Sequence, residues 1–450
     1  MKFFRSFIVF GCVIGTTLLT LVFNSCNNPD DPTDKSTELS VIEITPDSGS
    51  KNTIVKIVGT GFNLVPSNNE VTLNGKMCTV TDAFGEMLTI IIPAGAGSGK
   101  IKIETNGKVI FTPVFKYEYT EVNVITLAGG LPGFKDGMGT EAQFKTPITV
   151  AIDTSGNIYV ADQGNQKIRK ILPSGLVSTF AGSEKGFADG SALSAKFNLP
   201  TGIVIDKNQN IILTDAFNDK IRKITPQGIV STIAGSTTGY ADGNQDAAKF
   251  NVPYGIAIDR NGNYIVSDYL NNRIRKITPN GVVTTLAGKG DFQNNGGAFA
   301  DGVGTEAYFY YPTGVAIDND DRIYIADQFN HRIRSISTST EVTTIGGSGP
   351  VGQFNSGFAD GAAETSRFAQ PTGICFNRND STVVVADAGN HKIRIIKNGE
   401  VSTITGDFGY ADGASNIARF NGPSGVAIDR DGNIIIADSQ NHRIRKIVFE

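Results

Sequence analysis

Histidine, carboxylate and aromatic side chains are the groups in this 450-residue sequence whose chemistry and spacing could form a site. The three histidines, His331, His391 and His442, each follow an Ala-Asp-x-x-Asn element directly. They therefore occupy one position of a repeat. Copies of one repeat position lie too far apart to share a metal ion whose ligands must approach to about 2 Å. We expect these histidines to be structural and predict no metal site.

The carboxylates recur at the same element in six units, and each copy ends an apolar run. A residue present in every unit serves the unit itself, and aspartate commonly accepts hydrogen bonds from nearby backbone amides. We expect these aspartates to bind amides of the following loop; a carboxylate ring holding a metal is the alternative. The six are Asp162, Asp215, Asp268, Asp327, Asp387 and Asp438.

The sequence gives little indication of a calcium-binding loop or of a known catalytic motif. The spacing Asp259-x-Asn261-x-Asn263 imitates a calcium-binding loop, but its twelfth position is Leu270 rather than an acid, so we expect a hairpin turn. No Gly-x-Ser-x-Gly or His-Glu-x-x-His motif occurs. We predict no catalytic residue and no cofactor, and enzymatic activity stays open but is not favoured.

The amino-acid composition limits the fold classes and the kinds of partner that this chain can have. Glycine is abundant, with 52 residues, while charged residues make up only 19%, which favours a turn-rich all-β chain. The formal net charge of −4 lacks the basic excess that nucleic-acid binding needs, so we exclude nucleic acid as a partner. Four cysteines are too few for a disulfide-stapled scaffold.

The first 38 residues have the pattern of a targeting segment. Lys2 and Arg5 precede an uncharged run that ends at Ser25-Cys26, and a polar stretch follows. We predict a signal peptide over residues 1–25 and a flexible tether over 26–38; an uncleaved N-terminal anchor is the alternative. The junction resembles a bacterial lipobox, which implies lipidation of Cys26. Asp30-Asp31 resembles the export signals of Bacteroidetes surface lipoproteins, which implies an outer membrane lipoprotein exposed at the cell surface.

Residues 39–118 contain short alternating apolar runs that are separated by turn residues, as expected of a small sandwich. The stretches Thr45-Pro46-Asp47-Ser48-Gly49 and Gly59-Thr60-Gly61-Phe62 resemble the immunoglobulin-like IPT/TIG domain. That resemblance implies a spacer or an interaction module. Cys78 has no partner in this segment, so we expect a buried free thiol.

Residues 122–450 contain six copies of one unit. Each copy has four strand-length runs; in the third copy they are Gly255–Ile258, Asn263–Ser267, Arg273–Ile277 and Val282–Ala287. Four antiparallel strands per unit, six times over, predict a six-bladed β-propeller. The last copy stops after three runs. Residues 122–129 match the fourth run of the other copies, so we expect them to complete the last blade.

Two positions within the copies carry further information. The third run alternates basic residues with isoleucine, as in Lys167-Ile168-Arg169-Lys170-Ile171, and we expect a solvent-exposed strand face. A Pro-x-Gly element opens the first run of every copy except the first, where Thr149 replaces the glycine.

These copies resemble NHL repeats. Their arrangement is similar to that of secreted bacterial NHL proteins with an IPT/TIG domain in front, many of which accompany carbohydrate uptake. The resemblance implies a surface binding role, although NHL proteins also include lyases and hydrolases.

Aromatic residues break the symmetry of the copies. The recurring aspartates are 59 and 60 residues apart around the fourth and fifth copies, against 51 or 53 elsewhere, so the loops there are longer. Aromatic side chains gather beside these loops, where they could stack on sugar rings or grip a peptide. The alternative is that they only pack the loops. The candidate binding residues are Phe217, Tyr254, Tyr269, Tyr310, Tyr311 and Phe329.

These observations favour a lipid-anchored cell-surface protein that binds a glycan through one propeller face. A propeller lyase or hydrolase with a metal in its channel and a protein-docking subunit of a surface complex are the alternatives. The expected partners are a glycan or a cell-surface protein, with membrane contact through the lipid anchor only. The chain would act as a monomer or within an envelope complex.

Overall fold

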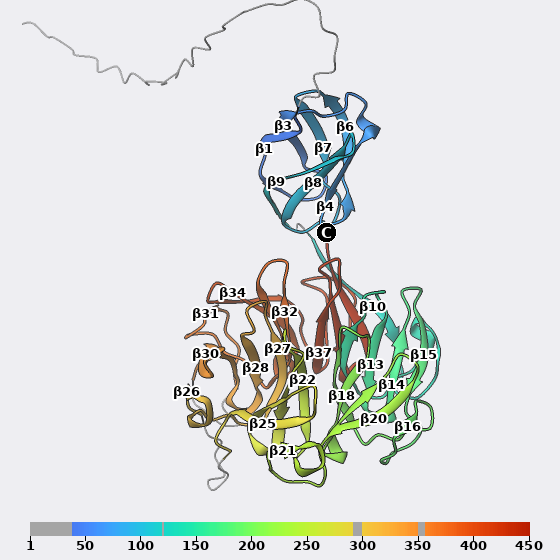
Figure 1. Cartoon of the computed structure of the whole chain (residues 1–450), viewed down its shortest axis with the longest axis vertical. Helices are drawn as coiled ribbons and strands as arrows, with labels where there is room; N and C mark the ends of the chain where they lie inside the picture. The colour runs from blue at the N-terminus through green and yellow to red at the C-terminus, as the bar shows by residue number, and fades with distance from the viewer. Residues whose placement is uncertain (1–37, 119–120, 291–298, 350–355) are drawn as a thin grey trace, which may run out of the picture. The chain divides into compact units, whose positions relative to one another are not determined.

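The computed structural model describes residues 38–118, 121–290, 299–349 and 356–450. The predicted signal peptide, Cys26 and all but the last residue of the predicted tether lie outside these ranges. The described chain is all-β, as predicted, with 3-10 turns as its only helical structure (Figure 1). No helix within these ranges is long and apolar enough to cross a membrane.

Residues 40–117 form a sandwich of two sheets. Alternating side chains of each sheet point inward, so that Val55 and Ile57 share one buried core with Val71, Leu73 and Phe115. The first sheet has the order β1 (Ser40–Thr45), β3 (Ile54–Thr60), β7 (Met87–Ile91), β6 (Thr79–Phe84). The second has the order β2 (Ser48–Gly49), β9 (Lys108–Tyr117), β8 (Gly99–Thr105), β4 (Asn69–Leu73), β5 (Lys76–Met77). A 3-10 turn, η1 (Pro66–Asn68), precedes β4. Cys78 is a buried free thiol, as expected.

Between residues 122 and 450 the described parts of the chain form six five-stranded sheets, the blades of the predicted propeller. Each blade has the predicted four antiparallel strands and one short strand that the sequence did not indicate. This extra strand is two residues long and pairs with the fourth strand at the outer edge of the blade. The extra strands are β11 (Gly137–Met138), β16 (Gly190–Ser191), β21 (Gly243–Asn244), β26 (Gly302–Val303), β31 (Gly361–Ala362) and β36 (Gly413–Ala414).

The innermost strand of each blade begins at the recurring proline and approaches the inner strand of the next blade closely. A Cβ atom on Gly373 would lie 2.0 Å from the backbone oxygen of Ser424, and one on Gly202 would lie 2.3 Å from that of Tyr254. This close approach explains the Pro-x-Gly element. The inner strands are β12 (Pro147–Ile152), β17 (Pro200–Ile205), β22 (Pro253–Ile258), β27 (Pro312–Ile317), β32 (Pro371–Asn377) and β37 (Pro423–Ile428).

The second strand of each blade is buried along its whole length, because it lies in the middle of its sheet and is covered by a neighbouring blade on each face. In each blade this second strand ends at the recurring aspartate. These strands are β13 (Ile158–Asp162), β18 (Ile211–Asp215), β23 (Tyr264–Asp268), β28 (Ile323–Asp327), β33 (Thr382–Asp387) and β38 (Ile434–Asp438).

A one-turn 3-10 helix joins each second strand to the third. These helices are η3 (Gln163–Asn165), η4 (Ala216–Asn218), η6 (Tyr269–Asn271), η8 (Gln328–Asn330), η9 (Ala388–Asn390) and η10 (Ser439–Asn441). Others lie between blades, namely η2 (Gly139–Glu141), η5 (Gln245–Ala247) and η7 (Gly304–Glu306). The turn at Asp259 joins a first strand to a second and is a hairpin turn, because the carboxylate accepts hydrogen bonds from the amides of Asn261 and Asn263.

The third and fourth strands complete each blade. The third strands are β14 (Lys167–Ile171), β19 (Lys220–Ile224), β24 (Arg273–Ile277), β29 (Arg332–Ile336), β34 (Lys392–Lys397) and β39 (Arg443–Phe449). The fourth strands of blades one to five are β15 (Leu176–Ala181), β20 (Ile229–Ala234), β25 (Val282–Ala287), β30 (Glu341–Gly346) and β35 (Glu400–Thr405).

The ring closes in the last blade as predicted. Its fourth strand is β10 (Val122–Gly129), which pairs antiparallel with β39, so the sixth sheet combines the first and last strands of the propeller. Val150 and Val160 of blade one then share a core with Ala437 and Ile444 of blade six. Closure therefore buries the faces of the first and last blades against each other and covers a sheet edge that would otherwise be free.

Candidate functional site

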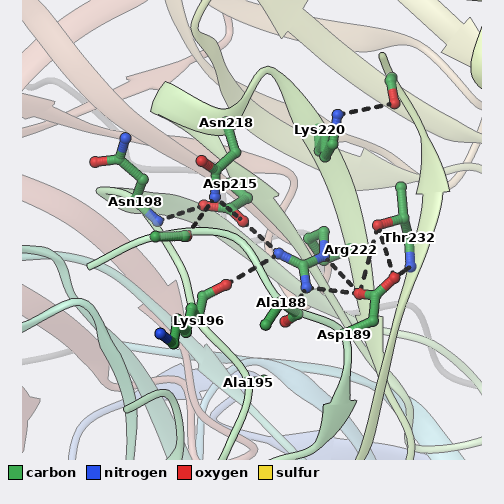
Figure 2. Close-up of polar contacts among 12 residues, drawn as sticks. Ala188, Asp189, Ala195, Lys196, Asn198, Asp215, Asn218, Lys220, Arg222 and Thr232 are labelled. Atoms are coloured by element: carbon green, nitrogen blue, oxygen red, sulfur yellow. Dashed lines mark hydrogen bonds and ion pairs between the residues drawn. The ribbon is translucent and has the colours of Figure 1, made fainter. Parts of the chain in front are cut away.

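A buried arginine organises each blade. In blade two the guanidinium of Arg222 contacts the carboxylate of Asp215 at 2.5 Å, and both side chains are fully buried (Figure 2). Asp215 also accepts hydrogen bonds from the Asn198 amide at 2.7 Å and from the Asn218 side chain at 2.8 Å. The other guanidinium nitrogens of Arg222 reach a second carboxylate, that of Asp189, at 2.6 Å. Every blade repeats this pair of contacts.

The second aspartate comes from the linker before the blade and fixes the blade's outer edge. Asp189 is partly exposed and accepts hydrogen bonds from the backbone and the hydroxyl of Thr232 in the fourth strand (Figure 2). A Phe or Tyr two residues before this aspartate covers the guanidinium: Phe187 lies 4.9 Å from the central carbon of Arg222. One arginine therefore ties the linker, the second strand and the fourth strand together.

Two expectations need correction here. The third strands do not form a solvent-exposed basic face, because one arginine in each is completely buried. The recurring aspartates do bind a backbone amide, but it belongs to the linker that precedes the blade rather than to the following loop; Asp162, for example, accepts from Lys145. The available signal was that the buried position is arginine in all six copies, whereas the basic residues around it vary. The buried arginines are Arg169, Arg222, Arg275, Arg334, Arg394 and Arg445.

The three histidines connect neighbouring blades, which is the structural role expected of them. Nδ1 of His391 accepts a hydrogen bond from the Gly422 amide at 3.1 Å, and Nδ1 of His442 accepts one from the Thr146 amide at 3.1 Å. His331 does the same with Gln370 at 3.0 Å. In the other three blades the side chains of Gln166, Asp219 and Asn272 accept the equivalent bond.

This arrangement predicts a pH dependence of stability. Burial lowers the pKa of His391 and of His442 below the ordinary value of 6.5, because the charged imidazolium is poorly solvated and would lose its acceptor nitrogen. The unfolded chain then binds more protons than the folded chain as the pH falls below about 6.5. We therefore expect the contribution of both histidines to the free energy of unfolding to be complete above pH 6.5 and to be lost on acidification.

Asparagine provides the matched control, since Asn272 makes the same bond in blade three. A His391→Asn/His442→Asn variant keeps the acceptor but does not titrate. Chemical denaturation between pH 5 and pH 8 should show a steeper loss of stability on acidification for the natural chain than for the variant. Parallel profiles would contradict the assignment.

The inner strands surround a central cavity of about 300 Å³. Its wall is formed by glycine and aliphatic side chains together with a few hydroxyl, aromatic and thiol groups. Tyr254 and Cys375 belong to this wall. Burial raises the pKa of the Cys375 thiol, which favours its protonated form at neutral pH. In the described ranges no three His, Cys, Asp or Glu side chains are grouped closely enough to hold a metal ion.

Five of the six candidate aromatic residues form one connected group, which we call the aromatic cluster: Tyr254, Tyr269, Tyr310, Tyr311 and Phe329. Tyr269 stacks on Tyr311 with ring centroids 4.7 Å apart, and Tyr254 lies 5.7 Å from Tyr269. Tyr310 lies 4.6 Å from Tyr311, and both rings meet Phe329 edge-on at 5.4 Å and 5.2 Å. The cluster joins blades three and four, and Tyr254 extends it to the wall of the central cavity.

All five rings are half-buried, and the cluster contains polar atoms. The hydroxyl of Tyr269 donates a hydrogen bond to Oε1 of Gln328 at 3.3 Å. The hydroxyls of Tyr310 and Tyr311 and the side-chain nitrogen of Gln328 have no partner among the described residues, and these atoms are not fully buried. The cluster therefore combines ring surface with free hydrogen-bonding groups.

The sixth candidate, Phe217, lies apart. It is 56% exposed and makes no ring contact with another aromatic side chain of the described chain. The sequence indicated the set by loop length and by residue type. It could not show which rings touch, because the contacts depend on how the second-to-third loops of adjacent blades meet.

The class of protein defined by this geometry is a small β-sandwich followed by a closed six-bladed propeller whose blades share one Asp–Arg network. Family comparison agrees with it. The IPT/TIG domain matches residues 39–119, and the NHL repeat matches residues 309–334, 368–396 and 420–447. The chain therefore carries an IPT/TIG domain and NHL repeats. The matched NHL segments lie in blades four to six, and the buried ion pairs extend the same unit to blades one to three.

Similar proteins occur in animals and in bacteria. NHL repeat-containing protein 2 of Gallus gallus is 27% identical over 359 residues, which cover 71% of this chain and 49% of that protein. The chain thus matches about half the length of this relative. A Bacteroides thetaiotaomicron protein of unknown function has a TM-score of 0.65 and 21% identity, covering 93% of this chain and 99% of that one. An auxiliary nutrient binding protein of the same organism has a TM-score of 0.56 and 20% identity, with the same coverage.

Proposed function

We propose that this chain is a cell-surface binding protein that is anchored through a lipid on Cys26 and binds a glycan at the aromatic cluster. The observation that carries the proposal is the contact of five aromatic rings across two blades, next to hydroxyl and amide groups that have no partner among the described residues. Sugars present both a face of C–H groups, which stacks on aromatic rings, and hydroxyls, which need hydrogen-bonding partners.

The rest of the molecule supports binding rather than catalysis. The ionisable networks of the blades are engaged in structural contacts, with the recurring aspartates paired to buried arginines and the histidines bonded to backbone amides. The auxiliary nutrient binding protein of Bacteroides thetaiotaomicron shares the fold, which supports a nutrient-binding role for this chain. The predicted lipobox supports attachment to a membrane by lipid alone.

A glycan array tests the proposal. Residues 39–450, which form one compact unit, would be applied beside a Tyr269→Ala/Tyr310→Ala/Phe329→Ala variant. We expect binding to one class of polysaccharide. Each ring contact contributes about 0.5–1.5 kcal/mol, so the triple variant should bind about 100-fold more weakly.

Phe217→Ala is the matched control, because Phe217 and Phe329 occupy the same repeat position in blades two and four. Since Phe217 contacts none of the five rings, we expect its loss to change affinity by less than about twofold. If the natural chain binds no glycan on the array, the glycan is overturned as the ligand, and docking of a cell-surface protein is favoured instead. Undiminished binding by the folded triple variant would overturn the site.

A further inference from the structure

We infer that the aromatic cluster selects uncharged glycans and that Gln328 is the residue that hydrogen-bonds the bound sugar. This inference rests on the proposed function and names the substrate class of the same site. It comes from the charges and the hydrogen bonds around the five rings.

The first argument is the lack of a counter-charge. The aromatic cluster and Gln328 carry no charge at neutral pH, and the cavity wall that Tyr254 borders contains no charged side chain among the described residues. The nearest recurring acids, Asp268 and Asp327, are fully buried and already paired with Arg275 and Arg334. A carboxylate or sulfate bound on the rings would lose water without gaining an ion pair, which disfavours its binding.

The pKa values of the tyrosines also indicate surroundings that disfavour a negative charge. Burial raises the pKa of Tyr254 to about 12 and also raises the pKa of Tyr269 and of Tyr310. A raised tyrosine pKa means that a negative charge at the ring oxygen is disfavoured. Surroundings that disfavour a phenolate also disfavour an anionic ligand at the same place.

The second argument is the orientation of Gln328. It is the first residue after Asp327, and its Oε1 accepts the hydroxyl proton of Tyr269 at 3.3 Å. This bond directs the amide nitrogen away from Tyr269, where its two hydrogens have no partner among the described residues. An amide donor fixed beside stacked rings fits the oxygen of a sugar hydroxyl.

Gln163 occupies the same repeat position in blade one and shows the alternative. Its side-chain nitrogen donates to the hydroxyl of Thr201 at 3.3 Å, so its amide is engaged within the protein. No aromatic ring follows it, since the next residue is Gly164. The same substitution can therefore be made at Gln328, a proposed binding position, and at Gln163, a structural position.

The experiment uses the full chain in detergent on an array that places neutral polysaccharides beside charged counterparts, such as dextran beside dextran sulfate and hydroxyethylcellulose beside carboxymethylcellulose. Gln328→Glu keeps an acceptor for Tyr269 but removes both donors and adds a negative charge. We expect every bound glycan to be neutral. Gln328→Glu should weaken binding at least about tenfold and Gln163→Glu by less than about twofold, with both variants shown by circular dichroism to be folded at the assay temperature.

Preferential binding of a sulfated or carboxylated glycan would overturn the inference and leave the proposed function standing. So would a Gln328→Glu variant that binds a neutral glycan as tightly as the natural chain. If the natural chain binds no glycan of either kind, the proposed function fails and the inference fails with it.

Discussion

Replacing Arg222 by methionine is expected to lower the free energy of unfolding by about 3–5 kcal/mol. The substitution keeps most of the side-chain volume but leaves the carboxylate of Asp215 fully buried without its cation. Burial raises the pKa of Asp215 and the neighbouring guanidinium opposes that rise, so removing the arginine leaves an uncompensated cost. The linker at Asp189 and the fourth strand at Thr232 lose their common anchor as well.

Lys223→Met is the control, because Lys223 is the next residue of the same strand and points to the other, partly exposed face. We expect its effect to stay within about 0.5 kcal/mol. Arg222→Met combined with Asp215→Asn should recover part of the loss, since no buried charge then lacks a partner. Urea denaturation followed by circular dichroism measures all three. A loss below about 1 kcal/mol for Arg222→Met would contradict the role of the pair as the centre of the blade.

Much of the fold was predictable because the same pattern of strand and turn residues recurs in six copies of the repeat. The strands at Arg273–Ile277 and Val282–Ala287 begin and end where the sequence pattern places them. Ring closure was equally readable, since the segment at residues 122–129 matches the fourth strand that the last copy lacks. These features depend on period and on local turn residues, both of which are visible in one chain.

The burial of arginine was not predictable from alternation alone. In a half-buried strand, charged residues between isoleucines normally face solvent, and that rule gave the wrong answer for Arg222. The rule fails because two aspartates from distant segments, Asp189 and Asp215, meet the guanidinium and compensate its desolvation. The aromatic cluster has a similar origin: its residue types were visible, but its contacts arise where two blades meet.

Substituting Val124 by aspartate is expected to destabilise the whole propeller by about 4 kcal/mol. Val124 lies in β10, is fully buried, and pairs with Ile447 of the last strand. An aspartate there would place a carboxylate without a partner in the core between blades five and six, in which Val124 packs with Phe420 and Ile393. β10 pairs the first residues of the propeller with β39, which holds its last residues. Weakening the pairing of these two strands is therefore expected to open the whole ring and not only a local segment.

Ile125→Asp is the matched control, since Ile125 is the next residue of β10, faces the other side of the sheet and is 43% exposed. We expect it to shift the thermal midpoint by no more than a few degrees. Hydrogen exchange then separates two mechanisms for Val124→Asp. If closure holds the ring together, protection falls in the second strands of all blades, including β18 and β23, which lie far from the substitution in sequence. If protection falls only in β10 and β39, blade six opens by itself, and the stability of the other blades does not depend on closure.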